Sequence, residues 1–340
     1  MLVNFPYEIF IEDDVSSQID NVLSKSGLGK KCIIFCNENV RELMGEKILS
    51  SMDSVHADIV EPDSLEKSYV ASMADKCSHY DFVIGMGGGR AIDLAKYAAF
   101  VSGKPWVAFP TILSHDGVVS SRAILNENGT KISVDAKEPS MIIADMNTIQ
   151  KAPYRYIAAG AGDLISNITA VEDWKIAHKD GREKYHVVMA KLSLLAAEAV
   201  QEHIQEIRIK DRHGLEILLW SLICSGFAMN IYGSSRPCSG SEHNFSHALE
   251  KLGSDALHGE QVALGTIVSA YMQGGDWQRI RSVLKELNLP TSAEQIGVDE
   301  KMATKALEIS ASIRDRYTIL SKNHIDEKKA QDILSACDVL

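Results

Sequence analysis

The feature of this chain that most constrains its fold is an alternation of strand-like and helix-like segments that covers the first 150 residues and then stops. Each strand-like run is short, apolar and rich in β-branched or aromatic residues. The predicted strands are Lys31–Cys36, Val55–Val60, Phe82–Gly85, Trp106–Phe109 and Met141–Ala144. Apolar residues at helical spacing predict a crossover helix over Ser64–Ser78. Such alternation is typical of a mainly parallel sheet with helices on its faces.

After Pro153 the strand signal disappears, and long helical patterns follow one another. We expect helices over Ile157–His178, Arg182–His203, His213–Ile231, Ser241–Leu252 and Gly259–Gln273. A chain of 340 residues exceeds the size at which one hydrophobic core usually keeps growing. The sequence therefore predicts two domains packed around a cleft, an α/β domain over residues 1–150 and an all-helical domain over residues 151–340.

Charge and composition exclude several classes of protein. The formal net charge is -11 and no long Lys/Arg cluster is present, which argues against nucleic acid as a partner. Six cysteines are scattered without a CxxC pair, as is typical of thiols in a reducing compartment. The N-terminus has neither a basic start nor a long apolar core, so we expect a cytoplasmic protein without a secretory signal. The apolar stretch Ile217–Met229 is too short for a membrane span of roughly 20 residues, and we interpret it as a core helix without membrane insertion.

Residues 82–96, FVIGMGGGRAIDLAK, join an apolar strand to an amphipathic helix through four glycines within five positions. Glycines let the backbone approach a phosphate closely, and a helix N-terminus favours an anion, so this turn is a candidate pyrophosphate site. The usual dinucleotide fingerprint has an acidic residue about 20 positions after its first glycine. Here Lys104 and Pro105 stand at that distance from Gly85, which disfavours the ordinary Rossmann variant. A tight turn without a ligand is the alternative.

A second group of chemically active residues lies in the predicted helical domain. Asp163 falls early in an apolar helical segment, where a buried carboxylate needs a partner. His243 and His247 are four residues apart on one helix face, and His258 follows. One carboxylate and two imidazoles could hold zinc or a similar divalent ion that polarises a carbonyl. Spacing alone favours His243 and His247 as the metal pair, and the alternative for each histidine is a helix cap or a satisfied core residue.

Polar residues also follow the predicted strand Trp106–Phe109, at the carboxyl edge of the expected sheet. Function commonly lies at this edge in α/β proteins. The residues are Thr111, Ser114, His115, Asp116 and Ser120. The alternative interpretation is a solvated loop without a ligand.

Taken together, these segments resemble a known enzyme family. The segments are GMGGGRAIDLAK, PTILSHDGVVS, GAGDLISN, SGSEHNFSHAL and LHGEQVALG. In order and spacing they are similar to those of the sn-glycerol-1-phosphate dehydrogenases, within the superfamily of glycerol dehydrogenases, dehydroquinate synthase-like proteins and iron-containing alcohol dehydrogenases. The resemblance implies a dinucleotide-binding α/β domain over residues 1–150 and a helical metal- and substrate-binding domain over residues 151–340.

The resemblance also implies roles for individual residues. Asp163, His243 and His258 would hold one divalent metal per subunit, usually zinc, whereas His247 and Asp116 would contact the substrate. The dinucleotide would be lined by Gly87, Gly88, Gly89, Arg90, Ala91, Ile92, Asp93, Thr111, Ser114 and Ser120. Arg90 stands where the family often has Lys, which keeps the charge and changes its geometry.

The expected function is the reversible, metal-dependent reduction of dihydroxyacetone phosphate to sn-glycerol 1-phosphate by NAD(H) or NADP(H), which supplies the backbone of ether lipids. His247 or Asp116 would relay the proton beside Asp163, and the family implies a homo-oligomer. Three alternatives stay open. They are a glycerol or polyol dehydrogenase, a dehydroquinate synthase-like lyase that only transiently reduces its nicotinamide, and a nucleotide-binding protein without catalysis.

Overall fold

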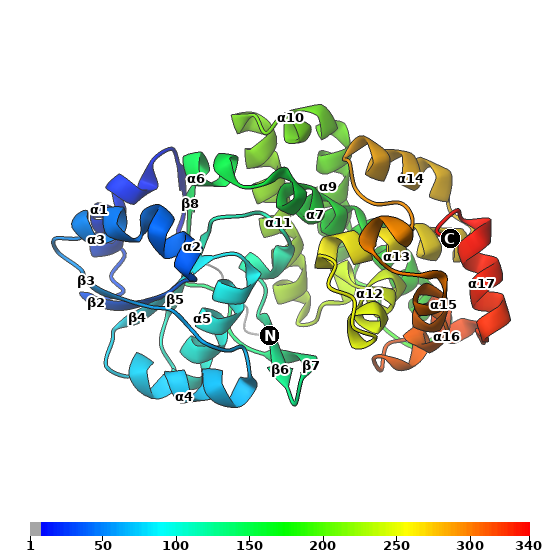
Figure 1. The fold of residues 1–340 in the computed structure, drawn as a ribbon, viewed down its shortest axis with the longest axis horizontal. Helices are drawn as coiled ribbons and strands as arrows, with labels where there is room; N and C mark the ends of the chain where they lie inside the picture. The colour runs from blue at the N-terminus through cyan, green and yellow to red at the C-terminus, as the bar shows by residue number, and fades with distance from the viewer. Residues whose placement is uncertain (1–7) are drawn as a thin grey trace. The chain divides into compact units, whose positions relative to one another are not determined.

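The computed structural model describes residues 8–340, apart from the side chain of residue 130, and these residues form two compact units. Unit 1 comprises the chain up to Leu113 together with Gly117–Ala152. Unit 2 comprises Ser114–Asp116 together with Pro153–Leu340. Figure 1 shows the strands and helices of unit 1 in blue to green and the helices of unit 2 in green to red.

Unit 1 is built on a six-stranded sheet in the order β1-β8-β5-β4-β2-β3, in which every neighbouring pair is parallel. Its strands are β1 Glu8–Glu12, β2 Lys31–Phe35, β3 His56–Val60, β4 Phe82–Gly87, β5 Trp106–Pro110 and β8 Met141–Asp145. Its helices are α1 Ile19–Lys25, α2 Glu38–Val40, α3 Glu46–Ser50, α4 Lys67–Cys77, α5 Gly89–Ser102 and α6 Met146–Lys151. All five predicted strands and the predicted crossover helix are present, with bounds that shift by up to three residues. The inner strands β4, β5 and β8 are buried along their whole length, as apolar runs in a covered parallel sheet are.

Two features of unit 1 lie outside the sequence prediction. The first is β1, an edge strand with exposed glutamates at both ends and only partly buried residues between them. The second is an antiparallel hairpin of β6 Arg122–Glu127 and β7 Thr130–Asp135. Its turn contains Asn128 and Gly129, both at positive φ, and Asn-Gly is the strongest short signal for a hairpin.

Unit 2 is helical throughout, so the predicted fold class, an α/β region followed by an all-helical region, is confirmed. Its helices are α7 Tyr154–Ile165, α8 Asn167–Lys179, α9 Val187–Glu202, α10 Ile204–Arg208, α11 Arg212–Tyr232, α12 Ser241–Lys251, α13 His258–Met272, α14 Trp277–Glu286, α15 Glu300–Ile309, α16 Ile319–Lys322 and α17 Glu327–Ala336. Trp174 and Met189 belong to one of its apolar clusters, with Tyr185 and Tyr232 packed against them.

Two predicted helices of unit 2 were wrong in extent. The segment predicted as one helix over Ile157–His178 is interrupted at Ser166, whose hydroxyl donates to the carbonyl of Asp163 at 2.6 Å. Asp163 therefore lies near the end of α7 and not early in a long helix. The helix predicted from Arg182 begins only at Val187. The ring of His186 caps its N-terminus, because Nδ1 accepts from the backbone N–H of Met189 in the first turn.

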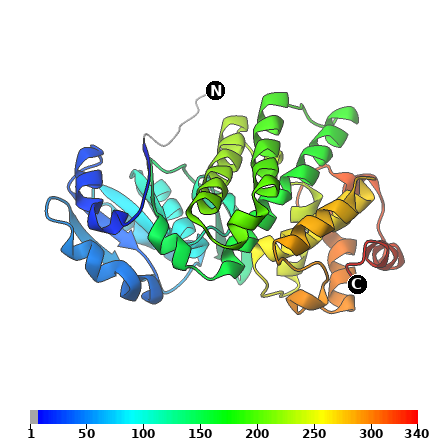
Figure 2. The same cartoon turned by 90° about the horizontal axis from the view of Figure 1, so that it is seen from above.

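Helix α11 is the one helix among residues 8–340 that is long and apolar enough to cross a membrane by length and composition. However, 61% of its apolar window is buried inside the structure. It runs alongside α9, as the green and yellow-green helices of Figures 1 and 2 show. Because of this packing, α11 is a core helix of unit 2 that contains the predicted core segment Ile217–Met229.

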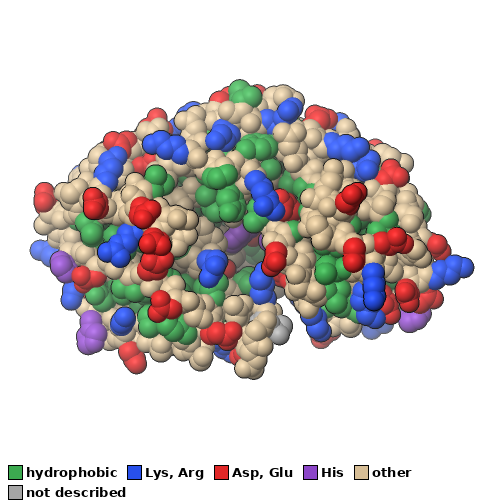
Figure 3. Space-filling view, in the orientation of Figure 1, with side chains coloured by type: hydrophobic (Ala, Val, Ile, Leu, Met, Phe, Trp, Pro, Cys, Tyr) green, Lys and Arg blue, Asp and Glu red, His purple; other side chains and the backbone are tan. Residues whose placement is uncertain are grey.

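Charged side chains of both signs are mixed over the surface. Figure 3 shows Lys and Arg interspersed with Asp and Glu on the face drawn, over both the α/β and the helical elements. On that face neither the acidic nor the basic side chains gather at one place.

Candidate functional site

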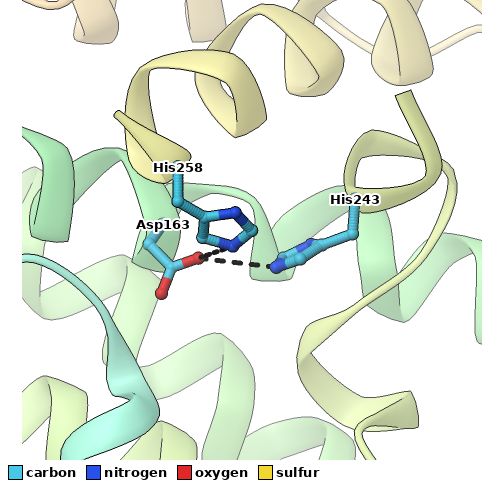
Figure 4. Close-up of side chains that lie close together, drawn as sticks. All are labelled: Asp163, His243 and His258. Carbon is cyan, nitrogen blue, oxygen red and sulfur yellow. Dashed lines mark ion pairs between the residues drawn. The ribbon is translucent and has the colours of Figure 1, made fainter. Parts of the chain in front are cut away.

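Asp163, His243 and His258 form a compact group within unit 2. One ligand atom from each lies within 4.8 Å of the other two. Asp163 Oδ1 is 3.5 Å from His243 Nε2 and 3.7 Å from His258 Nε2. Figure 4 shows the three side chains directed toward one another from α7, α12 and the start of α13. Sequence spacing alone did not single out this combination.

Glycines make the convergence possible, because they let two helices approach closely. A Cβ on Gly259, next to His258, would lie 1.9 Å from the carbonyl oxygen of Ala159 in α7. A Cβ on Gly162, next to Asp163, would lie 2.8 Å from the carbonyl oxygen of Gly259. Backbone atoms cannot yield as a flexible side chain does, so larger residues at these positions would separate the ligand atoms.

The electrostatics of the group favour one negative charge and one extra proton. Burial opposes ionisation of Asp163, but hydrogen bonding and charge interactions with the histidines outweigh it and lower the pKa of the carboxyl to about 2. Burial also opposes protonation of His243, yet its contacts with Asp163 and Glu242 raise its pKa to about 9. Burial lowers the pKa of His258, which leaves this ring neutral. Without an ion, His243 thus carries an extra proton between the carboxylates of Asp163 and Glu242. A metal cation could take the place of this proton.

The donor chemistry fits a divalent metal. One carboxylate oxygen and two imidazole nitrogens are the donor types that zinc takes, and three protein ligands leave a coordination position for substrate. Asp163 is only 4% exposed, so its charge needs a compensating partner.

His247 lies beside the group but not in it. Its ring centroid is 6.3 Å from that of His243 and 6.0 Å from that of His258. Its Nδ1 contacts Glu250 Oε2 at 3.2 Å, and burial lowers the pKa of the ring although Glu250 acts in the opposite direction. His247 is therefore a neutral imidazole oriented by a carboxylate.

Asp116 reaches the same group from the loop after β5. Its backbone N–H donates to Asp163 Oδ2 at 3.1 Å, and its own Oδ2 accepts from Ser225 Oγ of α11 at 2.8 Å. Asn167 Nδ2 in turn donates to Ser225 Oγ at 3.3 Å. A buried hydrogen-bonded chain therefore fixes the carboxylate of Asp116 relative to Asp163.

The glycine-rich turn in unit 1 joins β4 to α5 as the sequence predicts. A Cβ on Gly85 would meet the Cβ of Ala95 at 2.8 Å, and Gly87 has a φ of +146°, so both positions require glycine. The first amides of α5 follow directly, and amides at a helix N-terminus have no intrahelical acceptor. Arg90 is exposed at this end of the helix.

The other predicted dinucleotide residues of unit 1 have different surroundings. The backbone N–H of Thr111 donates to the carbonyl of Gly87, which places this residue next to the turn. Asp93, in contrast, faces inward, where it pairs with buried Lys96 at 3.1 Å and accepts from the backbone N–H of Ile124. Ser120 Oγ donates to the carbonyl of Arg122. The carboxylate of Asp93 thus ties α5 to the hairpin, whereas the contact of Ser120 stays within the segment that leads into β6.

Sequence reasoning missed the residues that hold the two cluster histidines from behind. Glu242 Oε1 lies 2.9 Å from His243 Nδ1, and Ser246 Oγ lies 3.4 Å from His258 Nδ1. The sequence offered two signals for these supporting residues. Glu242 is adjacent to His243, and Ser246, a hydroxyl residue, lies on the same helix.

Comparisons with known proteins identify the family of the chain. Residues 10–153 match the family described as iron-containing alcohol dehydrogenase. The glycerol-1-phosphate dehydrogenase of Pyrococcus furiosus, named for NAD(P)+, is 40% identical over 335 residues, which cover 97% of each chain. The one from Sulfurisphaera tokodaii is 39% identical over 344 residues, which cover 100% of this chain and 98% of the relative. The chain belongs to the glycerol-1-phosphate dehydrogenase family.

Several solved structures with low sequence identity share the fold. Glycerol dehydrogenase from Schizosaccharomyces pombe has a TM-score of 0.83 at 18% identity, over 99% of this chain and 90% of that one. Sulfoacetaldehyde reductase from Bifidobacterium kashiwanohense has a TM-score of 0.77 at 16% identity, over 99% of each chain. At this level of identity they establish the architecture of the family member and not its substrate.

Proposed function

We propose that this family member catalyses the reversible reduction of dihydroxyacetone phosphate to sn-glycerol 1-phosphate with NAD(H) or NADP(H). The observation that carries the proposal is the convergence of Asp163, His243 and His258, in a chain that aligns over nearly its whole length with glycerol-1-phosphate dehydrogenases. A polyol dehydrogenase is the second candidate, since the solved glycerol dehydrogenase has the same fold.

Asp163, His243 and His258 would hold one divalent ion, with zinc as the proposed metal because of their mixed oxygen and nitrogen donors. When bound, the ion would act as a Lewis acid on the substrate carbonyl, and the nicotinamide would supply the hydride. The residues from Gly87 to Asp93, together with Thr111, Ser114 and Ser120, form the proposed dinucleotide site. In that site the backbone of Gly87–Gly89 would face the pyrophosphate, while the carboxylate of Asp93 supports α5.

His247 and Asp116 are the proposed substrate-contacting residues. A neutral His247 whose Nδ1–H donates to Glu250 keeps its lone pair on Nε2, so Nε2 is the atom that takes up and delivers the proton. Glu250 stabilises the ring while it carries the charge. Asp116, fixed by Ser225, would orient the substrate and share in the proton relay beside Asp163.

The remaining assignments belong to the same proposal. Residues 1–150 would bind the dinucleotide, and residues 151–340 would bind the metal and the substrate. The enzyme would be a cytoplasmic homo-oligomer that supplies the glycerophosphate backbone of ether lipids.

The test is oxidation of NADH and NADPH by Zn²⁺-loaded protein with dihydroxyacetone phosphate or with dihydroxyacetone, with the enantiomer of the product read by a stereospecific coupled enzyme. We expect turnover on the phosphate alone and sn-glycerol 1-phosphate as the product. Turnover confined to dihydroxyacetone would replace the proposal with the polyol dehydrogenase. Inactivity on both substrates would overturn both.

A further inference from the structure

Glu242 is a buried acid in contact with a cluster histidine. Its side chain is 0% exposed, and Oε1 lies 2.9 Å from Nδ1 of His243, the next residue in α12. The backbone N–H of Gly240 donates to the same oxygen, and the hydroxyl of Thr169 lies 3.2 Å from the other. The backbone N–H of Gly240 and Nδ1 of His243 therefore face one oxygen of this carboxylate, as an ionised acceptor requires.

These contacts define how the ring of His243 presents its nitrogens. A carboxylate oxygen at Nδ1 keeps the ring proton on Nδ1. The opposite nitrogen, Nε2, is the one that lies 3.5 Å from Asp163 Oδ1. The Nδ1 edge of the ring thus contacts Glu242, and Nε2, the nitrogen at which a metal would replace the proton, is directed into the cluster.

His258 reaches the same tautomer through a weaker partner. Ser246 Oγ donates its one proton to Gln261 Oε1 at 3.0 Å. It therefore accepts from Nδ1 of His258 at 3.4 Å, and Nε2 of that ring lies 3.7 Å from Asp163 Oδ1. One cluster histidine is thus supported by a buried charge and the other by a neutral hydroxyl at longer range.

We propose that Glu242 is a positioning residue that sets the metal affinity of the cluster, by fixing His243 as an Nε2 ligand and increasing its basicity. The inference rests on the proposed function insofar as that function requires the metal. Removal of such supporting groups weakens metal binding about 10- to 100-fold in other metal sites. The neutral support of His258 by Ser246 makes the contribution of Glu242 the larger of the two.

The test compares Glu242→Gln with Glu250→Gln, using Zn²⁺ alone and a chromophoric chelator as competitor. Each substitution replaces a carboxylate that contacts Nδ1 of a histidine, but Glu250 contacts His247, which lies outside the metal group. We expect Zn²⁺ affinity to fall about 10- to 100-fold in Glu242→Gln and to change much less in Glu250→Gln, because the histidine hydrogen-bonded to Glu250, His247, is not a proposed ligand. Equal affinities in Glu242→Gln and wild type would overturn the inference and leave the proposed metal site intact. Absence of Zn²⁺ binding by wild type would overturn both.

A measurement on the unaltered chain covers the case in which Glu242→Gln fails to fold. In Co²⁺-loaded wild type, Nε2 ligation of both histidines gives two exchangeable, paramagnetically shifted Nδ1–H proton resonances. We expect the resonance of His243 to exchange more slowly with solvent, because its partner Glu242 is 0% exposed and charged. Fewer than two such resonances, or equal exchange of the two, would overturn the inference.

Discussion

The glycine-rich turn of unit 1 and the histidine cluster of unit 2, the two proposed binding sites, are built in different ways. The turn is made of backbone, and its requirements are the absence of a side chain at Gly85 and a positive φ at Gly87. The cluster is made of side-chain atoms held by further buried side chains, as Glu242 holds His243. A site made of backbone amides keeps its function with many different side chains around it, and such sites occur in many folds. A site made of side chains can lose its chemistry when a single ligand atom is replaced.

The largest expected effect that separates the two regions is that of Asp163→Asn. The amide removes the only anionic donor of the three, so we expect Zn²⁺ binding and turnover to be lost together, with a fall in kcat of about a thousandfold or more. Nucleotide affinity, which we propose to be a property of unit 1, should stay unchanged. Metal analysis, steady-state kinetics and nucleotide titration of the same preparation check this. Retained turnover would refute the metal role, and a parallel loss of nucleotide affinity would break the separation between the regions.

A metal-dependent difference in thiol protection is the second prediction. Burial raises the pKa of Cys32 in unit 1 to about 12 and raises that of Cys238 in unit 2 as well, so both react only after local opening. Zn²⁺ at about 100 times its Kd increases the free energy of opening of the structure that binds it by roughly 2.7 kcal/mol. We expect labelling of Cys238 to slow about 100-fold and that of Cys32 to stay the same.

Alkylation followed by peptide mass spectrometry measures both cysteines in one sample. Cys337, buried in unit 2 away from the cluster residues in sequence, serves as a second reporter of that unit. Equal protection of Cys32 and Cys238 by the metal would show that the two units open together, which contradicts the comparison.

Metal binding should also depend on pH, because the metal-free cluster holds a proton. The pKa of His243 is raised to about 9, so below that pH the ring must lose one proton before Nε2 can bind an ion. The lowered pKa of His258 adds no second proton near neutrality. The apparent Kd for Zn²⁺ should therefore rise about tenfold for each unit of pH lost between 9 and 6.

Calorimetry of Zn²⁺ binding at pH 7.5 in buffers of different ionisation enthalpy counts the protons released. One proton is the expected result, and zero or two would contradict the charge assignment. Nucleotide binding at the turn, the proposed dinucleotide site, should release none, which provides the internal contrast.

The fold was largely predictable because periodicity reports burial directly. The central strands β4 and β5 are continuous apolar runs, and helical spacing marks α4. Edge strand β1 escaped prediction because its apolar residues are confined to Ile9, Phe10 and Ile11, between two exposed glutamates. The hairpin β6–β7 carried a usable Asn128-Gly129 signal that was overlooked. The break at Ser166 depends on a local side-chain hydrogen bond, which hydrophobic spacing does not report.

The site was predictable in part. Family motifs correctly identified the family, and they proposed Asp163, His243 and His258, which the structure brings together. Spacing alone favoured His243 with His247, because both lie on one face of α12 and the approach of α13 through Gly259 is a tertiary contact. The same limit applies to Glu242, since only the folded chain shows which nitrogen of His243 it contacts.

The smallest expected effect, that of Gly85→Ala, tests the backbone side of the comparison. The added Cβ would meet the Cβ of Ala95 at 2.8 Å and the carbonyl oxygen of Ala91 at 3.2 Å, so β4 and α5 must separate slightly. We expect a loss of about 1–3 kcal/mol in the free energy of unfolding. The displaced N-terminus of α5 should raise the KM for the nucleotide severalfold, while the affinity for Zn²⁺ stays the same.

Gly103→Ala is the matched control, because Gly103 ends the same helix with a φ of +70° and no atom within 4 Å of an added Cβ. We expect Gly103→Ala to lower the free energy of unfolding by about 1 kcal/mol, because alanine is disfavoured at this positive φ. Gly103 lies at the opposite end of α5 from the turn. Denaturant unfolding and nucleotide kinetics of both variants separate crowding at the turn from general weakening of the helix. If Gly103→Ala raised the nucleotide KM as much as Gly85→Ala, the effect would follow from helix stability, and the turn would lose its distinct role. If only Gly85→Ala does so, a single methyl group at the turn disturbs nucleotide binding without touching any side chain of the metal cluster.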